Sequence, residues 1–212
     1  TAGLRNVQGI ACQHELLVVS DSGNHRIALY QTQGDSLDSQ PVFVGSRGRG
    51  DGEFSNPDHV AVYNNELFVA DKSNDRVQVF DLQSGGQAVG PSARFIRTFG
   101  RRGSRPGEFH GPTGMVVTAG SLVVVADQGN LLAPQSSPRC PPRVQVLSLY
   151  GVPLQVVTLG GAGNLVPNGM CVQDDRLFVV QRVGPSHWSS PPAATGSNGI
   201  VVLSFKPPQQ AR

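Results

Sequence analysis

One short sequence pattern occurs three times in this chain of 212 residues. Each copy runs from an apolar stretch into an aspartate, Asp21, Asp71 or Asp127, and an asparagine follows three positions later. The first two aspartates are 50 positions apart (71 − 21) and the next two are 56 apart (127 − 71). A period of this size is typical of repeat architectures, in which each unit buries its apolar face against its neighbours. The chain is therefore expected to form one continuous structure built from similar units.

Short apolar runs separated by turns divide each repeat into strands. In the second repeat, residues 58–62, 66–70, 76–80 and 93–99 fit β-strands, and Asn64 and Asn65 fit a tight hairpin turn. Comparable runs occupy residues 8–12, 16–20, 27–30 and 41–44, then 114–117, 122–126, 144–149 and 154–159, and finally 169–172, 176–180 and 199–205. No stretch has a helical period. Four antiparallel strands per repeat predict the blades of a β-propeller, and continuously apolar runs such as residues 122–125 predict strands buried on both faces.

The motifs of these repeats resemble the NHL repeat. The second repeat has Gly-Asp-Gly-Glu-Phe-Ser-Asn-Pro at 50–57, Val-Ala-Val at 60–62, Leu-Phe-Val-Ala-Asp at 67–71 and Asn-Asp-Arg-Val-Gln-Val-Phe at 74–80. The third keeps Pro-Gly-Glu-Phe-His-Gly-Pro at 106–112, whereas the fourth has Gln181 in place of the aspartate and Ile200 in place of the arginine. The resemblance implies an all-β NHL-type β-propeller spanning residues 1–212. Its four recognisable blades of four-stranded antiparallel sheet would lie at about residues 6–45, 56–100, 111–160 and 166–206.

Four blades are fewer than the five or six that the resemblance implies. The fourth repeat also has no recognisable outermost strand, because Lys206, Pro207 and Pro208 end its pattern. An unclosed propeller exposes an apolar sheet face at each end, which favours association. Two interpretations follow. The favoured one is a fragment of a longer chain, or an arc that further chain or another copy completes by self-association; the other is a compact four-bladed ring.

Charge and cysteine content limit the classes of partner and compartment. The formal net charge is +2, so nucleic-acid binding would have to come from local clusters of charge. No run of about 18 apolar residues occurs, so no membrane span is predicted. The cysteines Cys12, Cys140 and Cys171 show no disulfide spacing, which favours a reducing, cytoplasmic location. Cys12 and Cys171 lie in apolar runs and are expected to be small core residues, whereas Cys140 lies in a proline-rich insertion.

The recurring aspartates are expected to have a structural role. Each can accept N–H groups of the following turn and pair with the arginine that comes after it, Arg26 or Arg76. One aspartate per blade is too dispersed for a metal ion, whose ligands lie within about 2.0–2.6 Å. Of the five histidines, only His59 falls at an inner-strand position, where some NHL-like enzymes gather their metal ligands. We therefore expect no metal, no cofactor and no catalysis.

Basic loops form the candidate binding site. In a propeller, the loop before each inner strand and the loop between the second and third strands emerge on one face, so arginines far apart in sequence would converge there. Neighbouring glycines would let a phosphate backbone approach, although Asp51, Glu53 and Glu108 offset part of the positive field. An ordinary solvated surface is the competing explanation.

Two insertions rich in proline and serine, residues 131–142 and 183–198, extend the same side of the predicted propeller. The second carries the single tryptophan, Trp188, which could anchor a protein partner, stack on a base or simply pack its own loop. The candidate partner- or RNA-binding residues are Arg47, Arg49, Lys72, Arg101, Arg102, Arg105, Arg139, His187 and Trp188.

The sequence thus predicts a non-enzymatic platform that binds protein partners. The NHL resemblance implies a recognition domain such as those at the C-terminus of tripartite-motif ubiquitin ligases. No RING or B-box zinc pattern occurs here, so ligase activity would lie in another part of a parent chain. RNA binding through the arginine-rich loops is the second hypothesis, and an NHL-like metal-dependent enzyme is the third.

Overall fold

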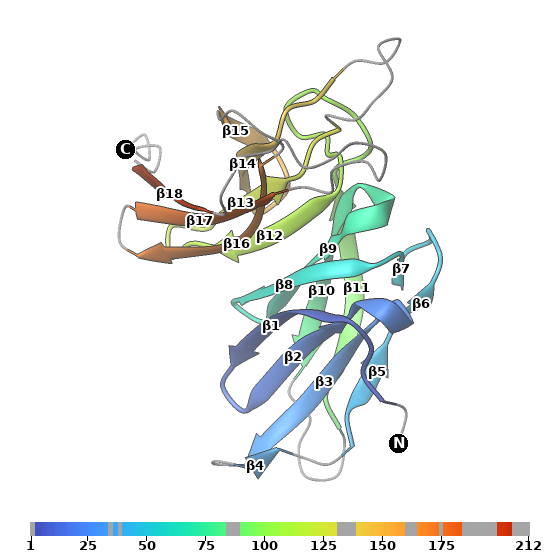
Figure 1. Ribbon diagram of the computed structural model, residues 1–212. Helices are drawn as coiled ribbons and strands as arrows, with labels where there is room; N and C mark the ends of the chain where they lie inside the picture. Colours follow the sequence, from blue (N-terminus) through green and yellow to red (C-terminus); the bar gives the residue numbers. More distant parts are fainter. Residues whose placement is uncertain are drawn as a thin grey trace.

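The structure is a computed structural model that describes residues 3–33, 36–37, 40–83, 90–130, 139–159, 165–173, 176–183 and 199–204. Within these residues the chain forms four antiparallel sheets arranged as the blades of a β-propeller (Figure 1). The helical elements of the described part are two 3-10 turns, η1 (Ser22–Asn24) and η2 (Lys72–Asn74). The predicted all-β propeller fold is confirmed.

Each blade is a meander of consecutive strands. Blade 1 contains β1 (Val7–Gln13), β2 (Leu16–Asp21), β3 (Arg26–Gln33), β4 (Ser36–Leu37) and β5 (Val42–Val44). Blade 2 contains β8 (Pro57–Tyr63), β9 (Glu66–Asp71), β10 (Arg76–Gln83) and β11 (Ser92–Phe99). Blade 3 contains β12 (Pro112–Val117), β13 (Leu122–Asp127), β14 (Arg143–Ser148) and β15 (Pro153–Thr158). Blade 4 contains β16 (Leu165–Gln173), β17 (Arg176–Val183) and β18 (Gly199–Ser204).

The predicted strands all occur, with ends that differ by a few residues. Asn64 and Asn65 both have positive φ, 48° and 61°, as the predicted tight turn between β8 and β9 requires. The two-residue β4 and the parallel pair of β6 (Ser46–Arg47) and β7 (Glu53–Phe54) were not predicted. Pairs of two residues carry no periodicity, so the sequence pattern could not reveal them.

The blades pack face to face around their inner strands, which lie side by side in the order β1, β8, β12 and β16. For each blade, we call the sheet face that packs on the following blade the forward face. The opposite sheet face of the same blade is its backward face. Between blades 1 and 2, Leu16 and Ile27 meet Phe54, Leu67 and Phe80 in one buried cluster. Similar clusters fill the other two interfaces. Burial on both faces explains the continuously apolar run in β13, every residue of which is buried.

At each end of this series, no other blade of the described residues packs on the outer sheet face. On the backward face of blade 1, Ile10 is 63% exposed, and on the forward face of blade 4 Ile200 is 69% exposed. Val180 and Val202, on the same face as Ile200, are also exposed. The four blades therefore form an arc with exposed apolar side chains on one sheet face at each end, although Val19 and Ala28, on the same face as Ile10, are buried.

The prediction for the cysteines was wrong. Cys12 and Cys171 are exposed, whereas Cys140, next to the proline-rich insertion, is fully buried. Cys12 points from β1 and Cys171 from β16 onto the uncovered faces, so no neighbouring blade shields them. Burial raises the pKa of the Cys140 thiol, which keeps it protonated.

Candidate binding site

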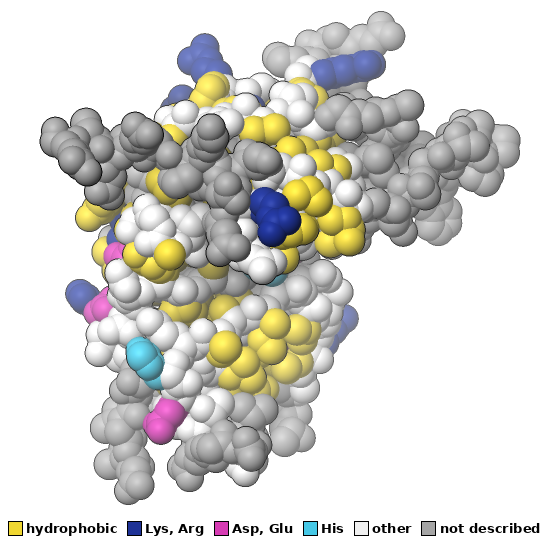
Figure 2. All heavy atoms as spheres, turned by 90° about the vertical axis from the view of Figure 1, so that its left-hand side faces the viewer, with side chains coloured by type: hydrophobic (Ala, Val, Ile, Leu, Met, Phe, Trp, Pro, Cys, Tyr) yellow, Lys and Arg dark blue, Asp and Glu magenta, His cyan; other side chains and the backbone are white. Residues whose placement is uncertain are grey.

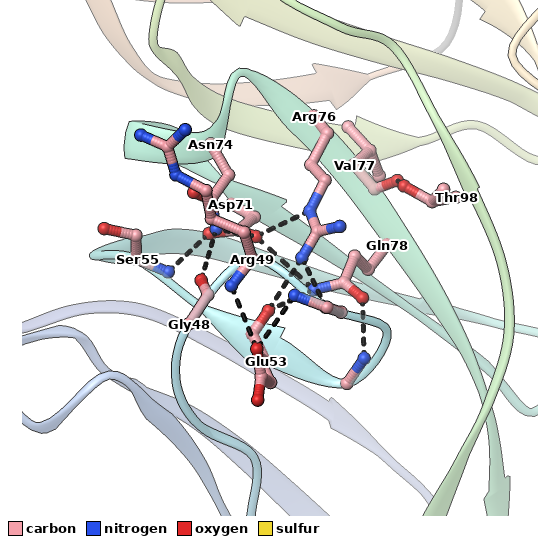
Figure 3. A network of polar contacts seen from close by, with 12 residues as sticks. Gly48, Arg49, Glu53, Ser55, Asp71, Asn74, Arg76, Val77, Gln78 and Thr98 are labelled. Atoms are coloured by element: carbon pink, nitrogen blue, oxygen red, sulfur yellow. Dashed lines mark hydrogen bonds and ion pairs between the residues drawn. The ribbon is translucent and has the colours of Figure 1, made fainter.

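A buried aspartate ends the second strand of each of the first three blades and anchors the loop that precedes the blade. Asp71 Oδ1 accepts the backbone N–H of Ser55 at 2.7 Å, and Oδ2 accepts Asn74 Nδ2 at 2.8 Å and Arg76 Nε at 2.9 Å (Figure 3). Asp21 and Asp127 accept equivalent backbone donors and pair with arginines at 2.7 and 3.0 Å. The predicted structural role of these aspartates agrees with this geometry.

The arginine that pairs with Asp71 also fixes the loop in front of β8. Arg76 donates from its terminal nitrogen to the carbonyls of Gly50 and Glu53, at 2.7 and 2.9 Å. Gln78, fully buried, donates to the same Glu53 carbonyl at 2.7 Å and accepts the N–H of Gly52 at 2.9 Å. The Glu53 carboxylate in turn accepts the N–H groups of Arg49 and Gly50. Figure 3 shows how these contacts hold the Arg49 backbone in one position.

Blade 3 repeats this arrangement with residues that the sequence analysis did not single out. Arg143 pairs with Asp127 and donates to the carbonyls of Ser104 and Glu108, both at 2.6 Å. Gln145 donates to the Glu108 carbonyl and accepts the N–H of Gly107. The signal was available, because Arg-Val-Gln-Val occurs at 76–79 and again at 143–146. The insertion before Arg143 places the Arg-Val-Gln-Val of blade 3 farther from Asp127 than that of blade 2 is from Asp71.

Burial affects the three aspartates differently. It raises the pKa of Asp71 and Asp127 above the ordinary value, although amide and guanidinium donors counteract it. At Asp21 burial also acts upward, but donors from Arg5, Asn24 and Arg26 prevail and the pKa is lowered. Each carboxylate is committed to loop donors, which leaves none of them as an accessible acid or base.

The predicted basic residues divide into engaged and exposed side chains. Lys72 pairs with Asp58 at 3.1 Å, and Arg101, although exposed, pairs with Glu108 at 3.0 Å. The Arg105 amide, then Arg101, lower the pKa of Glu108. The remaining predicted arginines, Arg47, Arg49, Arg102, Arg105 and Arg139, are exposed and make no ion pair within the described part of the chain. His187 and Trp188 lie outside the described residues.

A surface pocket brings two of these arginines together from different loops. Its lining consists of Arg49, Ser73, Asn74, Asp75, Arg76 and Arg102. Arg49 comes from the loop before β8, Arg102 from the loop before β12, and Asn74 from the turn after β9. Asn74 Oδ1 is buried and has no hydrogen-bond partner among the described residues. Arg47, Arg105 and Arg139 do not line this pocket.

The described residues contain no group of three or more histidine, cysteine, aspartate or glutamate side chains placed to hold a metal ion. His59 is half-buried in β8, and burial lowers its pKa. No helix in the described ranges is long and apolar enough to span a membrane.

Comparisons with known proteins agree with the fold. No protein-family model matches the chain. Over 134 residues it is 31% identical to Protein brain tumor of Drosophila melanogaster, an alignment that covers 62% of this chain and 11% of that protein. The chain thus spans about a tenth of the length of this relative.

Three solved structures are similar in shape. The computationally designed Ika4 protein has a TM-score of 0.52 at 11% identity, with 97% of this chain and 94% of that chain covered. A nidogen/laminin complex has a TM-score of 0.55 at 16% identity, with coverage of 84% and 57%. Glutaminyl cyclase of Myxococcus xanthus has a TM-score of 0.50 at 16% identity, with coverage of 82% and 60%. At these identities the likeness concerns the fold alone. The chain is therefore a four-bladed β-propeller that is similar in sequence to part of Protein brain tumor.

Proposed function

We propose that this chain is an NHL-type propeller that acts as a non-enzymatic platform for protein partners and binds an acidic segment of a partner at the pocket of Arg49, Arg102 and Asn74. The observation that carries the proposal is the meeting of two exposed arginines from separate blades beside an unpaired buried acceptor. An acidic peptide offers carboxylates for the guanidinium groups. Its backbone N–H would reach Asn74 Oδ1 only after the Asn74 side chain turned toward the pocket, since that oxygen is buried. A phosphate backbone offers acceptors for the arginines but fewer donors for Asn74.

Rigid support makes these loops suitable for recognition. The backbone at Arg49 is fixed by Glu53, and the carbonyls around it are held by Arg76 and Gln78. A loop that is ordered before binding loses less conformational entropy when a partner docks. Within a larger chain such as a ubiquitin ligase, this platform would select substrates in the cytoplasm.

RNA binding is the second candidate. It is favoured by the exposed arginines Arg47, Arg49, Arg102 and Arg105, which lie in two glycine-rich loops and make no ion pair among the described residues. Four such charges could follow a single-stranded phosphate backbone.

The test is binding of the whole chain to an array of glutamate- and aspartate-rich peptides, with glutamine and asparagine versions as controls. The tightest peptide is then measured by fluorescence anisotropy against a double variant, Arg49→Ala with Arg102→Ala. If each arginine contributes about 1.5 kcal/mol through charge-assisted hydrogen bonds, the double variant binds about a hundredfold more weakly. Arg94→Ala is the matched control, because Arg94 is exposed on β11 and pairs with Asp81 outside the pocket. Equal affinity for the neutral peptides would contradict the proposal.

A randomised RNA pool measured in parallel separates the two candidates. If RNA binds more tightly than any acidic peptide, and only RNA binding weakens in the double variant, the function is RNA recognition. A catalytic role predicts metal in the purified protein, which elemental analysis would detect.

A further inference from the structure

The uncovered face of blade 4 consists of positions that neighbouring blades bury elsewhere in the molecule. Val180 pairs with Ile200 across β17 and β18. The same register joins Ser20 to Ile27 in blade 1, Ala70 to Val77 in blade 2 and Ala126 to Val144 in blade 3. All six of those counterparts are 0% exposed, whereas Val180 and Ile200 are 46% and 69% exposed. The forward face of blade 4 is therefore a blade–blade interface without its second half.

On the backward face of blade 1, an apolar position of the inner strand is also exposed where its counterparts in blades 2 and 3 are buried. Ile10 pairs with Val19 in the register that joins Val60 to Val69 in blade 2 and Met115 to Val125 in blade 3. Val60 and Met115 are each 1% exposed, because the preceding blade covers them, whereas Ile10 is 63% exposed. Figure 2 shows two separate gatherings of hydrophobic side chains on the right of the view, one in the lower half and one in the upper half of the molecule. In Figure 1, blade 1 lies in the lower half of the molecule with blade 2, and blade 4 lies in the upper half with blade 3.

Two of the three inner-strand contacts between successive blades have a glycine at the point of closest approach, and β8 has His59 at the equivalent position. A Cβ atom on Gly9 of β1 would lie 2.8 Å from the Cα atom of His59 in β8, and one on Gly114 of β12 would overlap the carbonyl oxygen of Asn168 in β16. Gly169 holds the same position in β16, one residue before Met170, and a Cβ atom built on it would have nothing within 4 Å. Blade 4 thus keeps the room into which another inner strand could fit.

The two exposed cysteines fall at matching positions of such a contact. At the first interface between blades, Ala11 on the inner strand of blade 1 and Val62 on the inner strand of blade 2 pack against the same hydrophobic cluster. The same pairing of positions recurs in the second and third interfaces. By strand register, Cys171 on the forward face of blade 4 corresponds to Ala11, and Cys12 on the backward face of blade 1 corresponds to Val62.

We propose that the forward face of blade 4 binds the backward face of blade 1 of a second copy of this chain, head to tail. Each internal interface joins one forward face to one backward face, and the four-bladed arc leaves one of each kind free. A second copy offers the face that is equivalent, position by position, to the one that covers blades 1 to 3. The contact is heterologous, and two reciprocal contacts close two copies into a ring, which prevents open-ended growth.

The first test is the molar mass of the purified chain by sedimentation velocity over a range of concentrations. We expect a dimer for the unaltered chain, and monomers for Ile200→Asp and for Ile10→Asp, because either substitution places a carboxylate in both contacts of the ring. Ile96→Asp is the matched control. Ile96 is exposed on the outer strand β11, away from both end faces, so this variant should remain dimeric.

Mixing the two monomeric variants distinguishes the head-to-tail contact from other dimers. A pair made of one Ile200→Asp chain and one Ile10→Asp chain keeps one unaltered contact, so the mixture should recover a heterodimer. If forward faces instead bound each other, Ile10→Asp alone would still be dimeric and mixing would restore nothing. That result would overturn the proposal, as would a monomeric unaltered chain at all concentrations.

Cross-linking tests the register independently of stability. A short bismaleimide reagent should join Cys12 of one copy to Cys171 of another and give a covalent dimer. Cys12→Ser or Cys171→Ser should abolish this product, whereas Cys140→Ser should leave it unchanged, since Cys140 is buried within its own chain. A cross-linked dimer that persists without either exposed cysteine would refute the proposed register.

Discussion

Phe54 links the core of the propeller to the loop that carries Arg49, and its removal should measure what a covering blade contributes. The Phe54 side chain is fully buried between blades 1 and 2, with its ring centroid 5.7 Å from that of Phe80. A buried aromatic side chain removes about 200 Å² from water, which at about 25 cal/mol per Å² is worth about 5 kcal/mol. Phe54→Ala should therefore lower the free energy of unfolding by about 3–5 kcal/mol, a large part of a typical domain stability.

The matched control is Leu4→Ala. Leu4 holds the position in blade 1 that Phe54 holds in blade 2. Leu4 precedes Arg5, whose N–H donates to Asp21, and Phe54 precedes Ser55, whose N–H donates to Asp71. Leu4 has no preceding blade to cover it and is 39% exposed, so its truncation should lower the free energy of unfolding by only about 1 kcal/mol.

The assay is urea denaturation followed by circular dichroism, with both substitutions made in the Ile200→Asp background so that association does not contribute. Phe54→Leu provides a milder truncation in case Phe54→Ala does not fold. Equal losses for Phe54→Ala and Leu4→Ala would refute the reasoning that the neighbouring blade is the source of the stabilisation.

Three further outcomes are expected. If RNA is the ligand, four phosphate contacts predict a slope of about −2.8 for log K against log salt concentration, and the double variant Arg49→Ala with Arg102→Ala should reduce it to about −1.4 in a filter-binding titration. Burial lowers the pKa of His59, so below pH about 6.5 the unfolded chain binds a proton at this residue more readily than the folded chain does. The free energy of unfolding therefore decreases as the pH falls, and His59→Gln should flatten that part of the pH–stability curve. Gly100→Ala should cost more than about 2 kcal/mol in urea denaturation, because Gly100 has φ of 85° and a Cβ there would overlap the Phe109 ring.

Controls accompany two of these outcomes. Gly52 has φ of 76°, yet nothing lies within 4 Å of a Cβ at that position. Gly52→Ala therefore reports backbone strain alone, and a loss as large as that of Gly100→Ala would show that the clash with Phe109 is unimportant. For RNA, Arg94→Ala should leave the salt slope unchanged, since Arg94 lies outside the loops in question.

Much of the fold was predictable because its signals are local. Strand positions followed from apolar runs, and the β8–β9 turn followed from Asn64-Asn65. The pairing of Asp71 with Arg76 followed from their spacing in sequence, whereas the bond from Asp71 to the Ser55 N–H of the preceding loop was not predicted. The equivalent role of Arg143 was missed, since an insertion separates it from Asp127 and only the repeated Arg-Val-Gln-Val connects the two blades.

The candidate site was predictable only as a set of loops. That Arg101 is engaged by Glu108 while Arg102 lines a pocket with Arg49 depends on side-chain directions within adjacent residues. Composition and spacing carry no information on such directions. The sequence showed Asn74 only as part of the repeated pattern after Asp71. The structure shows that its amide nitrogen donates to Asp71 and Gly48, while its Oδ1 has no partner among the described residues.

The sequence by itself determined the repeat, the strands, the turns and the pairing of Asp21 and Asp71 with the arginine after each, because these depend on contacts between residues close together in the chain. The tertiary structure decided which faces are covered, since burial depends on segments about 50 residues apart. Cys12 and Cys171 show the difference: their apolar surroundings suggested a core, but each lies on a sheet face that no other blade covers within the part of the chain that the structure describes.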